Sequence, residues 1–122
     1  MAAIDDVARD FTAMLRLGQF EAAGERYWSD AVISIEPADV SIGIPALVSG
    51  IAAARGKARV RFGEGCIEEL GIDGPFVTGD QFALFFDMLI KGAAEGDIQP
   101  FTQIAIFTVR NGRIIEERFF YD

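Results

Sequence analysis

Two carboxylates of this sequence, Glu36 and Asp87, could carry acid–base chemistry, because each lies beside apolar residues that would limit its hydration. Glu36 ends a β-branched run, and Asp87 lies within the apolar segment 83–90. A carboxyl group that loses hydration suits the role of general base. Tyr121 and Asp122 add a phenol and a further carboxylate after the last apolar residues, and a phenol can donate a hydrogen bond to developing negative charge. These residue types indicate proton transfer without a cofactor.

The placement of these carboxylates depends on which face of a strand looks inward. Glu36 lies either in a pocket or in a turn that faces solvent, since alternate residues of a strand point to opposite sides. Asp87 lies either on the concave side of a sheet, with Phe85, or on the outer side, paired with a cation such as Arg118. Asp122 is alternatively a frayed terminal residue.

Aromatic side chains are abundant enough to line a pocket for a small, mostly apolar ligand. The sequence holds 11 phenylalanines among 122 residues. They form either a thick core or the wall of an apolar cavity with few polar groups. The candidate ligand contacts are Phe11, Trp28, Phe85, Phe101, Gln103 and Phe119.

Helical periodicity dominates the first half of the sequence. Apolar residues at helical spacing predict a first helix that starts near Ile4 and ends before Gly18, and a second helix over residues 20–29. A strand over residues 31–36 follows. A third helix is predicted after Gly43, with an end near Gly56.

From residue 60 onward the apolar period approaches two, which predicts a sheet. The expected strands cover residues 60–72, 76–90, 98–109 and 113–121. Asn111-Gly112, the strongest hairpin signal, separates the last two strands. Helices followed by strands indicate an α+β fold, with three helices packed on a strongly bent antiparallel sheet to form a cone. One domain should span residues 1–122.

Composition restricts the classes of partner. A net charge of −8 disfavours nucleic acid, and the basic cluster Arg55, Lys57, Arg59 and Arg61 is interpreted as the cationic end of a helix that leads into a strand edge. With no histidine and Cys66 as the single cysteine, we expect no metal site, no internal disulfide and a cytoplasmic location. No apolar run approaches the ~18 residues that a membrane span requires.

Four local motifs occur in a characteristic order along the sequence. They are Gly18-Gln-Phe-Glu-Ala22, Tyr27-Trp-Ser-Asp-Ala31, Gly43-Ile-Pro-Ala-Leu47 and the hairpin Asn111-Gly-Arg-Ile114. In this order the sequence resembles the nuclear transport factor 2-like superfamily, in particular its branch of SnoaL-like polyketide cyclases and ketosteroid isomerases. The resemblance implies a cone-shaped fold, and it is far less specific for any activity.

The resemblance also implies roles for individual residues. Glu36 before a proline resembles the carboxylate base of the isomerases, and Asp122 resembles the late aspartate of SnoaL-like chains. Tyr121 falls where related enzymes line their cavity. The oxyanion-stabilising tyrosine of the isomerases, however, falls on Phe11, and their protonated aspartate falls near Ile104 or Ala105, depending on how the hairpin is aligned. Loss of one such donor costs about 3 kcal/mol of transition-state stabilisation, which argues against a steroid-type isomerase unless Gln103 or Tyr121 substitutes.

Two classes of function follow. The first is a cofactor-independent isomerase, cyclase or lyase with Glu36, Asp87 or Asp122 as the base and Tyr121 or Gln103 as the donor. The alternative is a ligand-binding or dimerisation domain without chemistry. Apolar residues on both faces of segment 82–89 also predict a homodimer through the sheet, since one set would otherwise be exposed.

Overall fold

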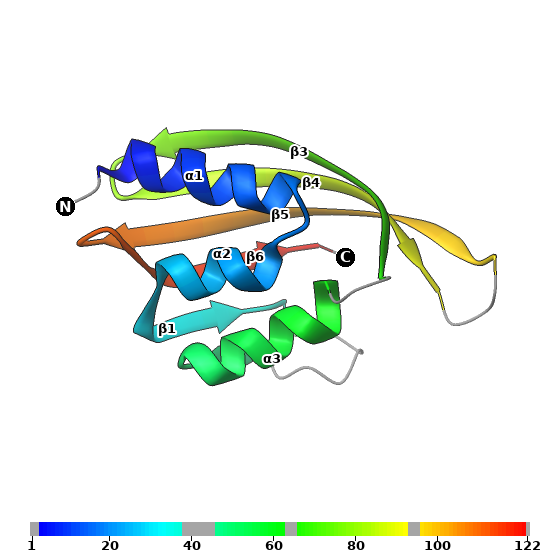
Figure 1. Ribbon diagram of the computed structural model, residues 1–122, viewed down its shortest axis with the longest axis horizontal. Coiled ribbons are helices and arrows are strands. Elements are labelled where there is room, and N and C mark those ends of the chain that lie inside the picture. The colour runs from blue at the N-terminus through cyan, green and yellow to red at the C-terminus, as the bar shows by residue number, and fades with distance from the viewer. Residues whose placement is uncertain (1–2, 38–45, 63–65, 93–95, 122) are drawn as a thin grey trace.

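Three helices lie on one side of a curled, unclosed sheet (Figure 1). The computed structural model describes residues 3–37, 46–62, 66–92 and 96–121, the side chains of 61 and 62 excepted. The elements are α1 (Ile4–Arg16), α2 (Phe20–Tyr27), β1 (Trp28–Ile35), β2 (Leu47–Ser49), α3 (Ile51–Phe62), β3 (Ile67–Thr78), β4 (Gln81–Lys91), β5 (Ile98–Arg110) and β6 (Arg113–Phe120). The predicted α+β class, with helices packed on a bent sheet, is confirmed.

The six strands follow the order β2-β1-β6-β5-β4-β3. The four long strands β3 to β6 pair antiparallel, as predicted, and β1 pairs antiparallel with β2 but parallel with β6. The hairpin between β5 and β6 turns at Asn111 and Gly112, with φ values of 52° and 75°. Positive φ at both positions is what the Asn-Gly pair favours, so this prediction is confirmed.

The third helix begins later and ends later than predicted. Residues 47–49 form β2 and pair with β1, and Gly50, at φ 91°, precedes the first turn of α3. Gly56 lies inside the helix rather than at its end. A glycine costs a helix only about 1 kcal/mol, so neighbouring contacts can carry α3 past it. The predicted start at Gly43 lies outside the described residues.

The boundary between the first two long strands was also misplaced. Residues 60–62 belong to α3, and β3 continues through Gly74-Pro75 to Thr78, so the turn falls at Gly79 and Asp80. Since β3 is an edge strand, a proline there removes no ladder hydrogen bond that the sheet needs. The register shifts between Asp73 and Phe76, where the strand accommodates the proline as a bulge.

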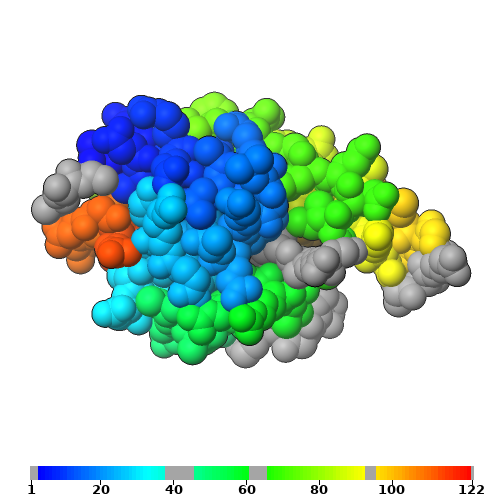
Figure 2. Space-filling model, in the orientation of Figure 1, coloured from blue at the N-terminus to red at the C-terminus, as the bar shows by residue number. Residues whose placement is uncertain are grey.

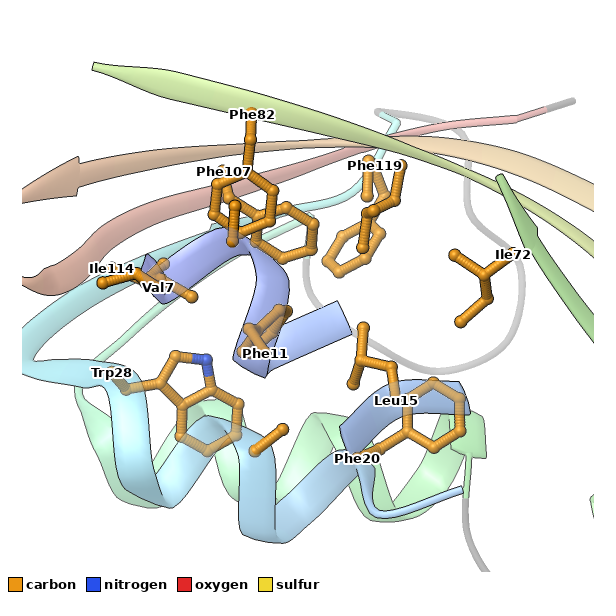
Figure 3. Packing of buried hydrophobic residues seen from close by; sticks show 14 of the residues in the cluster. Val7, Phe11, Leu15, Phe20, Trp28, Ile72, Phe82, Phe107, Ile114 and Phe119 are labelled. Atoms are coloured by element: carbon orange, nitrogen blue, oxygen red, sulfur yellow. The ribbon is translucent and has the colours of Figure 1, made fainter. Parts of the chain in front are cut away.

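The core lies between the helices and the concave face of the sheet, and aromatic rings fill it (Figure 3). Phe11 of α1 packs edge-on against Phe107 with 5.0 Å between ring centroids, and Phe82 stacks on Phe107 at 4.9 Å. A buried phenylalanine contributes roughly 1.5–3 kcal/mol relative to an exposed one. Side chains of α1, α2 and α3 cover the middle of the sheet, and the ends of the long strands extend beyond them on both sides (Figure 2).

In the described part of the chain, no helix combines the length and the apolar character that crossing a bilayer requires.

Candidate functional site

Glu36 directly follows Ile35, the last residue of β1, and lies on the face of the sheet that packs against the helices. Val32, Ser34 and Glu36 are all buried, so the inward placement of this face is established. The Glu36 backbone N–H donates to the carbonyl of Ala46 at 2.7 Å, which ties the end of β1 to the segment that leads into β2. The carboxylate is thus held inside the molecule.

Lys57 of α3 supplies the charge that opposes Glu36. Its Nζ lies 3.1 Å from Glu36 Oε2, and the two side chains are 3% and 0% exposed. The same ammonium lies 4.7 Å from the centroid of the Phe119 ring, in a cation–π contact. Because both charged groups are removed from water, each is stable only while the opposite charge of the other compensates for the lost hydration.

The interpretation of the basic cluster was wrong at Lys57. All four basic residues lie within α3. Arg55 and Arg59 bind Glu25 and Glu21 on α2 through exposed ion pairs, whereas Lys57 turns inward. A helical stripe through Ile51, Ala54, Lys57 and Ala58 would have revealed this, had Gly56 not been taken as the end of the helix.

Tyr121 follows β6 and completes the group at this end of the sheet. Its hydroxyl donates to Glu36 Oε1 at 3.0 Å, and its ring packs edge-on against Phe101 with 5.0 Å between centroids. Gln103, one strand away on β5, is 2% exposed. We call Glu36, Lys57 and Tyr121 the Glu36 cluster. It joins three elements that lie far apart in the sequence.

Glu117 forms a second buried polar group deeper in the interior. Its Oε1 accepts from Trp28 Nε1 at 2.8 Å, and its Oε2 accepts from the Ser34 hydroxyl at 2.6 Å. Burial raises the pKa of Glu117, while the hydrogen bonds from Ser34 and Trp28 and the charge of Lys57 act in the opposite direction. The charge of Glu36 raises this pKa further, so the two carboxyl groups are electrostatically coupled.

The raised pKa of Glu117 makes the stability depend on pH. The folded state holds this proton more tightly than the unfolded chain does. The resulting stabilisation is therefore complete below the ordinary pKa of 4.5 and is lost as the pH rises through the folded value. We expect Glu117→Gln to flatten the decline in the free energy of unfolding that sets in as the pH rises above the ordinary pKa of 4.5, measured by urea denaturation. Glu116→Gln, a control on the outer face of β6, should leave the wild-type decline intact. A variant at Glu117 that keeps that decline would refute this assignment.

A small hollow lies in the interior of the described part of the molecule. It measures about 30 Å³ and lies among Phe11, Trp28, Phe107, Glu117 and Phe119, among others. A volume of this size holds about one water molecule. Phe11, Trp28 and Phe119 belong to the buried core beside it.

A wider, open groove of about 620 Å³ lies beside the Glu36 cluster. Pro37, Phe101, Gln103 and Tyr121 line it at the end of β6, and Phe85, Ile104 and Phe120 line it on the outer face of the sheet. The groove thus brings together three predicted ligand contacts and one predicted catalytic residue.

The remaining predicted residues lie elsewhere. Asp87 is exposed on the outer face of β4, which is the second of the two placements that the sequence left open. Phe85, which lines the groove, lies on the same outer face as Asp87. Because alternate residues of a strand change sides, the inward packing of Phe82 and Phe86 places Phe85 and Asp87 outside. Asp122 lies outside the described residues.

Nothing in the described ranges brings three metal-ligating side chains together. The polar groups found here can bind, orient and exchange protons with an organic ligand.

Comparison with known proteins identifies the family. Residues 2–121 match the family described as the SnoaL-like domain. The chain belongs to this family. A solved structure described as a SnoaL-like polyketide cyclase, from Mesorhizobium loti, is similar to this SnoaL-like domain at 33% identity. The alignment covers 98% of this chain and 100% of that one, with a TM-score of 0.87.

More distant structures share the fold of this SnoaL-like domain. One, described as a nuclear transport factor 2-like protein of unknown function from Burkholderia pseudomallei, is 14% identical, with a TM-score of 0.79 and coverage of 100% of this chain and 92% of that one. Another, described as a SnoaL-like polyketide cyclase from Jannaschia sp. CCS1, is 19% identical, with a TM-score of 0.76 and coverage of 100% and 90%. Among curated proteins, none matches. The resemblance to the nuclear transport factor 2-like superfamily and its SnoaL-like branch is confirmed.

Proposed function

We propose that this SnoaL-like domain binds a small, mostly apolar molecule beside the Glu36 cluster and catalyses a proton transfer on it without a cofactor. The reaction class is isomerisation, cyclisation or elimination by carboxylate acid–base catalysis. The observation that carries the proposal is the continuous chain from Tyr121, at the groove, to the buried Glu36 and its counter-ion Lys57. Such a chain connects a ligand to a carboxylate that is shielded from solvent.

The surroundings of the cluster support an apolar ligand. Phe101 packs on the ring of Tyr121, and Pro37 lines the groove beside them. Gln103 contributes an amide that can donate to or accept from a polar substituent. The groove therefore offers both apolar and polar contacts to a small ligand.

A ligand screen followed by NMR tests the binding. Two-dimensional amide spectra recorded with small bicyclic aromatic alcohols and ketones should show shifts concentrated at Phe101, Gln103 and Tyr121. Tyr121→Phe should weaken binding by about three- to tenfold, since one hydrogen bond contributes about 0.5–1.5 kcal/mol. Ile98→Ala, an exposed residue that is not among those lining the groove, is the control. Shifts confined to other surfaces would contradict the proposed site.

The non-catalytic alternative has its own support. Both oxygens of Glu36 already accept hydrogen bonds, from Lys57 and from Tyr121, as they would in a purely structural cluster. Deuterium uptake from D₂O into the carbon beside the carbonyl of a bound ketone separates the two. Uptake that Glu36→Gln abolishes supports the enzyme, and binding without uptake supports the alternative.

We further propose a homodimer through the outer face of the sheet. Phe85, Ile104 and Phe120 form a row across β4, β5 and β6, paired in register, and are 36%, 46% and 46% exposed. The same row lines one side of the groove, so a second copy seated on it would form part of the groove wall. Sedimentation should show a dimer that Phe120→Glu converts to a monomer, whereas a wild-type monomer would refute the proposal.

We also infer a location in the reducing cytoplasm, with which the single cysteine of the sequence agrees.

A further inference from the structure

The groove beside the Glu36 cluster lies at a step in the sheet. The pairing of β5 with β6 stops at Ile104 and Phe120, whereas β5 extends as far as Ile98. The buried Gln103 lines the groove from the inner face, and Phe85, Ile104 and Phe120 line it from the outer face. The groove is therefore open toward the outer face of the sheet.

A single copy of the chain covers only one side of a ligand in this part of the groove. Phe85, Ile104 and Phe120 line it while they are 36%, 46% and 46% exposed. Sites for small ligands usually bury about 70–90% of the surface of the ligand. An apolar ligand that lay on these three side chains would keep its far side in water. A second wall opposite the row would remove that surface from water and so favour binding.

The charges around the row match a second copy of the same face. Arg118 lies two residues from Phe120 toward the β5–β6 hairpin, and Asp87 lies two residues from Phe85 in the opposite direction. Both charged side chains are exposed on the outer face. A twofold axis that crosses Ile104 within the interface, between these two corners, brings Asp87 of each copy opposite Arg118 of the other. Such a face is complementary to itself.

Arg118 also keeps the capacity to bind a second carboxylate. Its Nε lies 3.8 Å from Glu116 Oε2 in the same chain, which is too far for a hydrogen bond. A guanidinium has five N–H donors, so donors remain for Asp87 of a second copy.

The size of the outer face also suits a second copy. Strands β3 to β6 are 12, 11, 13 and 8 residues long. With about 4.8 Å between strands and about 3.4 Å per residue, they span roughly 19 by 35 Å. This area is of the order that a standard interface requires, which is about 800 Å² per partner.

We infer that the ligand site is composite: the outer face of a second copy completes the groove, so ligand binding and dimerisation strengthen each other. This inference rests on the proposed function, because it concerns the same groove and the same class of apolar ligand. Each bound ligand tightens the dimer by the factor by which dimerisation tightens the binding of that ligand. A second wall that covers roughly 50 Å² of apolar ligand surface corresponds to about tenfold in affinity.

An exchange of charges on the outer face tests the coupling, with naphthol, a bicyclic aromatic alcohol, as the probe. Asp87→Arg and Arg118→Asp each place like charges opposite each other across the twofold axis, although neither residue is among those that line the groove. Sedimentation should show each single variant as a monomer at a concentration where the wild type is a dimer. Calorimetry at that concentration should show that each single variant binds naphthol about tenfold more weakly. The double variant Asp87→Arg/Arg118→Asp restores opposite charges and should recover both the dimer and the affinity.

The reciprocal effect is measured on the wild-type chain, whose dimer should dissociate less readily as naphthol is added. The inference is overturned if naphthol binds the single variants as tightly as the wild type, or if the double variant recovers neither property. A wild type that stays monomeric with naphthol present overturns it as well. In each of these cases the groove of a single copy can still bind naphthol. If naphthol shifts no amide signals at Phe101, Gln103 and Tyr121 of the wild type, the proposed function fails, and the inference fails with it.

Discussion

Replacing Lys57 by methionine is expected to lower the free energy of unfolding by about 3–5 kcal/mol. The substitution keeps most of the side-chain volume but removes the ammonium that lies 3.1 Å from Glu36 Oε2. The Glu36 side chain, which is 0% exposed, would then be a buried carboxylate without its lysine partner. Such a group must either remain charged in an apolar environment or take up a proton, and both cost free energy. Urea denaturation with a constant slope measures the effect.

Two control variants show whether the burial of the Glu36–Lys57 pair causes the loss of stability in Lys57→Met. Glu36→Gln combined with Lys57→Met removes both charges, and we expect it to recover most of the lost stability, since uncharged residues can replace a buried pair with little penalty. Arg59→Met on the same helix breaks an exposed pair with Glu21, which should cost at most about 1 kcal/mol. Equal losses for Lys57→Met and Arg59→Met would show that the Lys57 pair is no more than a surface interaction.

Gly24→Ala is expected to destabilise the protein by about 1–3 kcal/mol, although alanine is the better helix former. A Cβ atom at this position of α2 would meet three ring atoms of Trp28. That indole is buried and donates to Glu117, so a shift of the ring would also disturb the inner polar group. Fluorescence of the single tryptophan would report the displacement directly.

Gly56→Ala on α3 is the matched control. A Cβ atom there meets nothing within 4 Å, so the substitution should stabilise the protein by about 0.5–1 kcal/mol. Opposite signs for the two glycines are the expected result. A gain in stability at both positions would show that Trp28 is not held against α2 as described.

Local chemistry made some parts of the fold predictable. Asn111 and Gly112 both adopt positive φ, which that pair favours irrespective of its surroundings, and the helical spacing from Ile4 to Leu15 is confirmed in α1. Gly74-Pro75 was misread as a turn because tolerance of a proline depends on lying at a sheet edge, which only the strand order reveals. The local sequence therefore predicts the elements better than it predicts their limits.

The candidate site was less predictable, because long-range contacts assemble it. Glu36 was identified from its position beside apolar residues and Tyr121 from the family resemblance, but their hydrogen bond spans 85 residues. Lys57 was assigned to a solvated helix end because lysine is seldom buried. The sequence did not decide which face of β4 points inward, because both Phe82 and Phe85, on opposite faces, are apolar. Only the packing of the folded chain shows that the face of Phe82 is buried.

A crystal structure of the protein grown with naphthol tests the central claim most directly. The account predicts ligand density in the groove beside Phe101, with the naphthol oxygen within hydrogen-bond distance of the Tyr121 hydroxyl and with Glu36 still bound to both Lys57 and Tyr121. Naphthol bound only at other surfaces, or a Tyr121 ring turned away from Glu36, would contradict it.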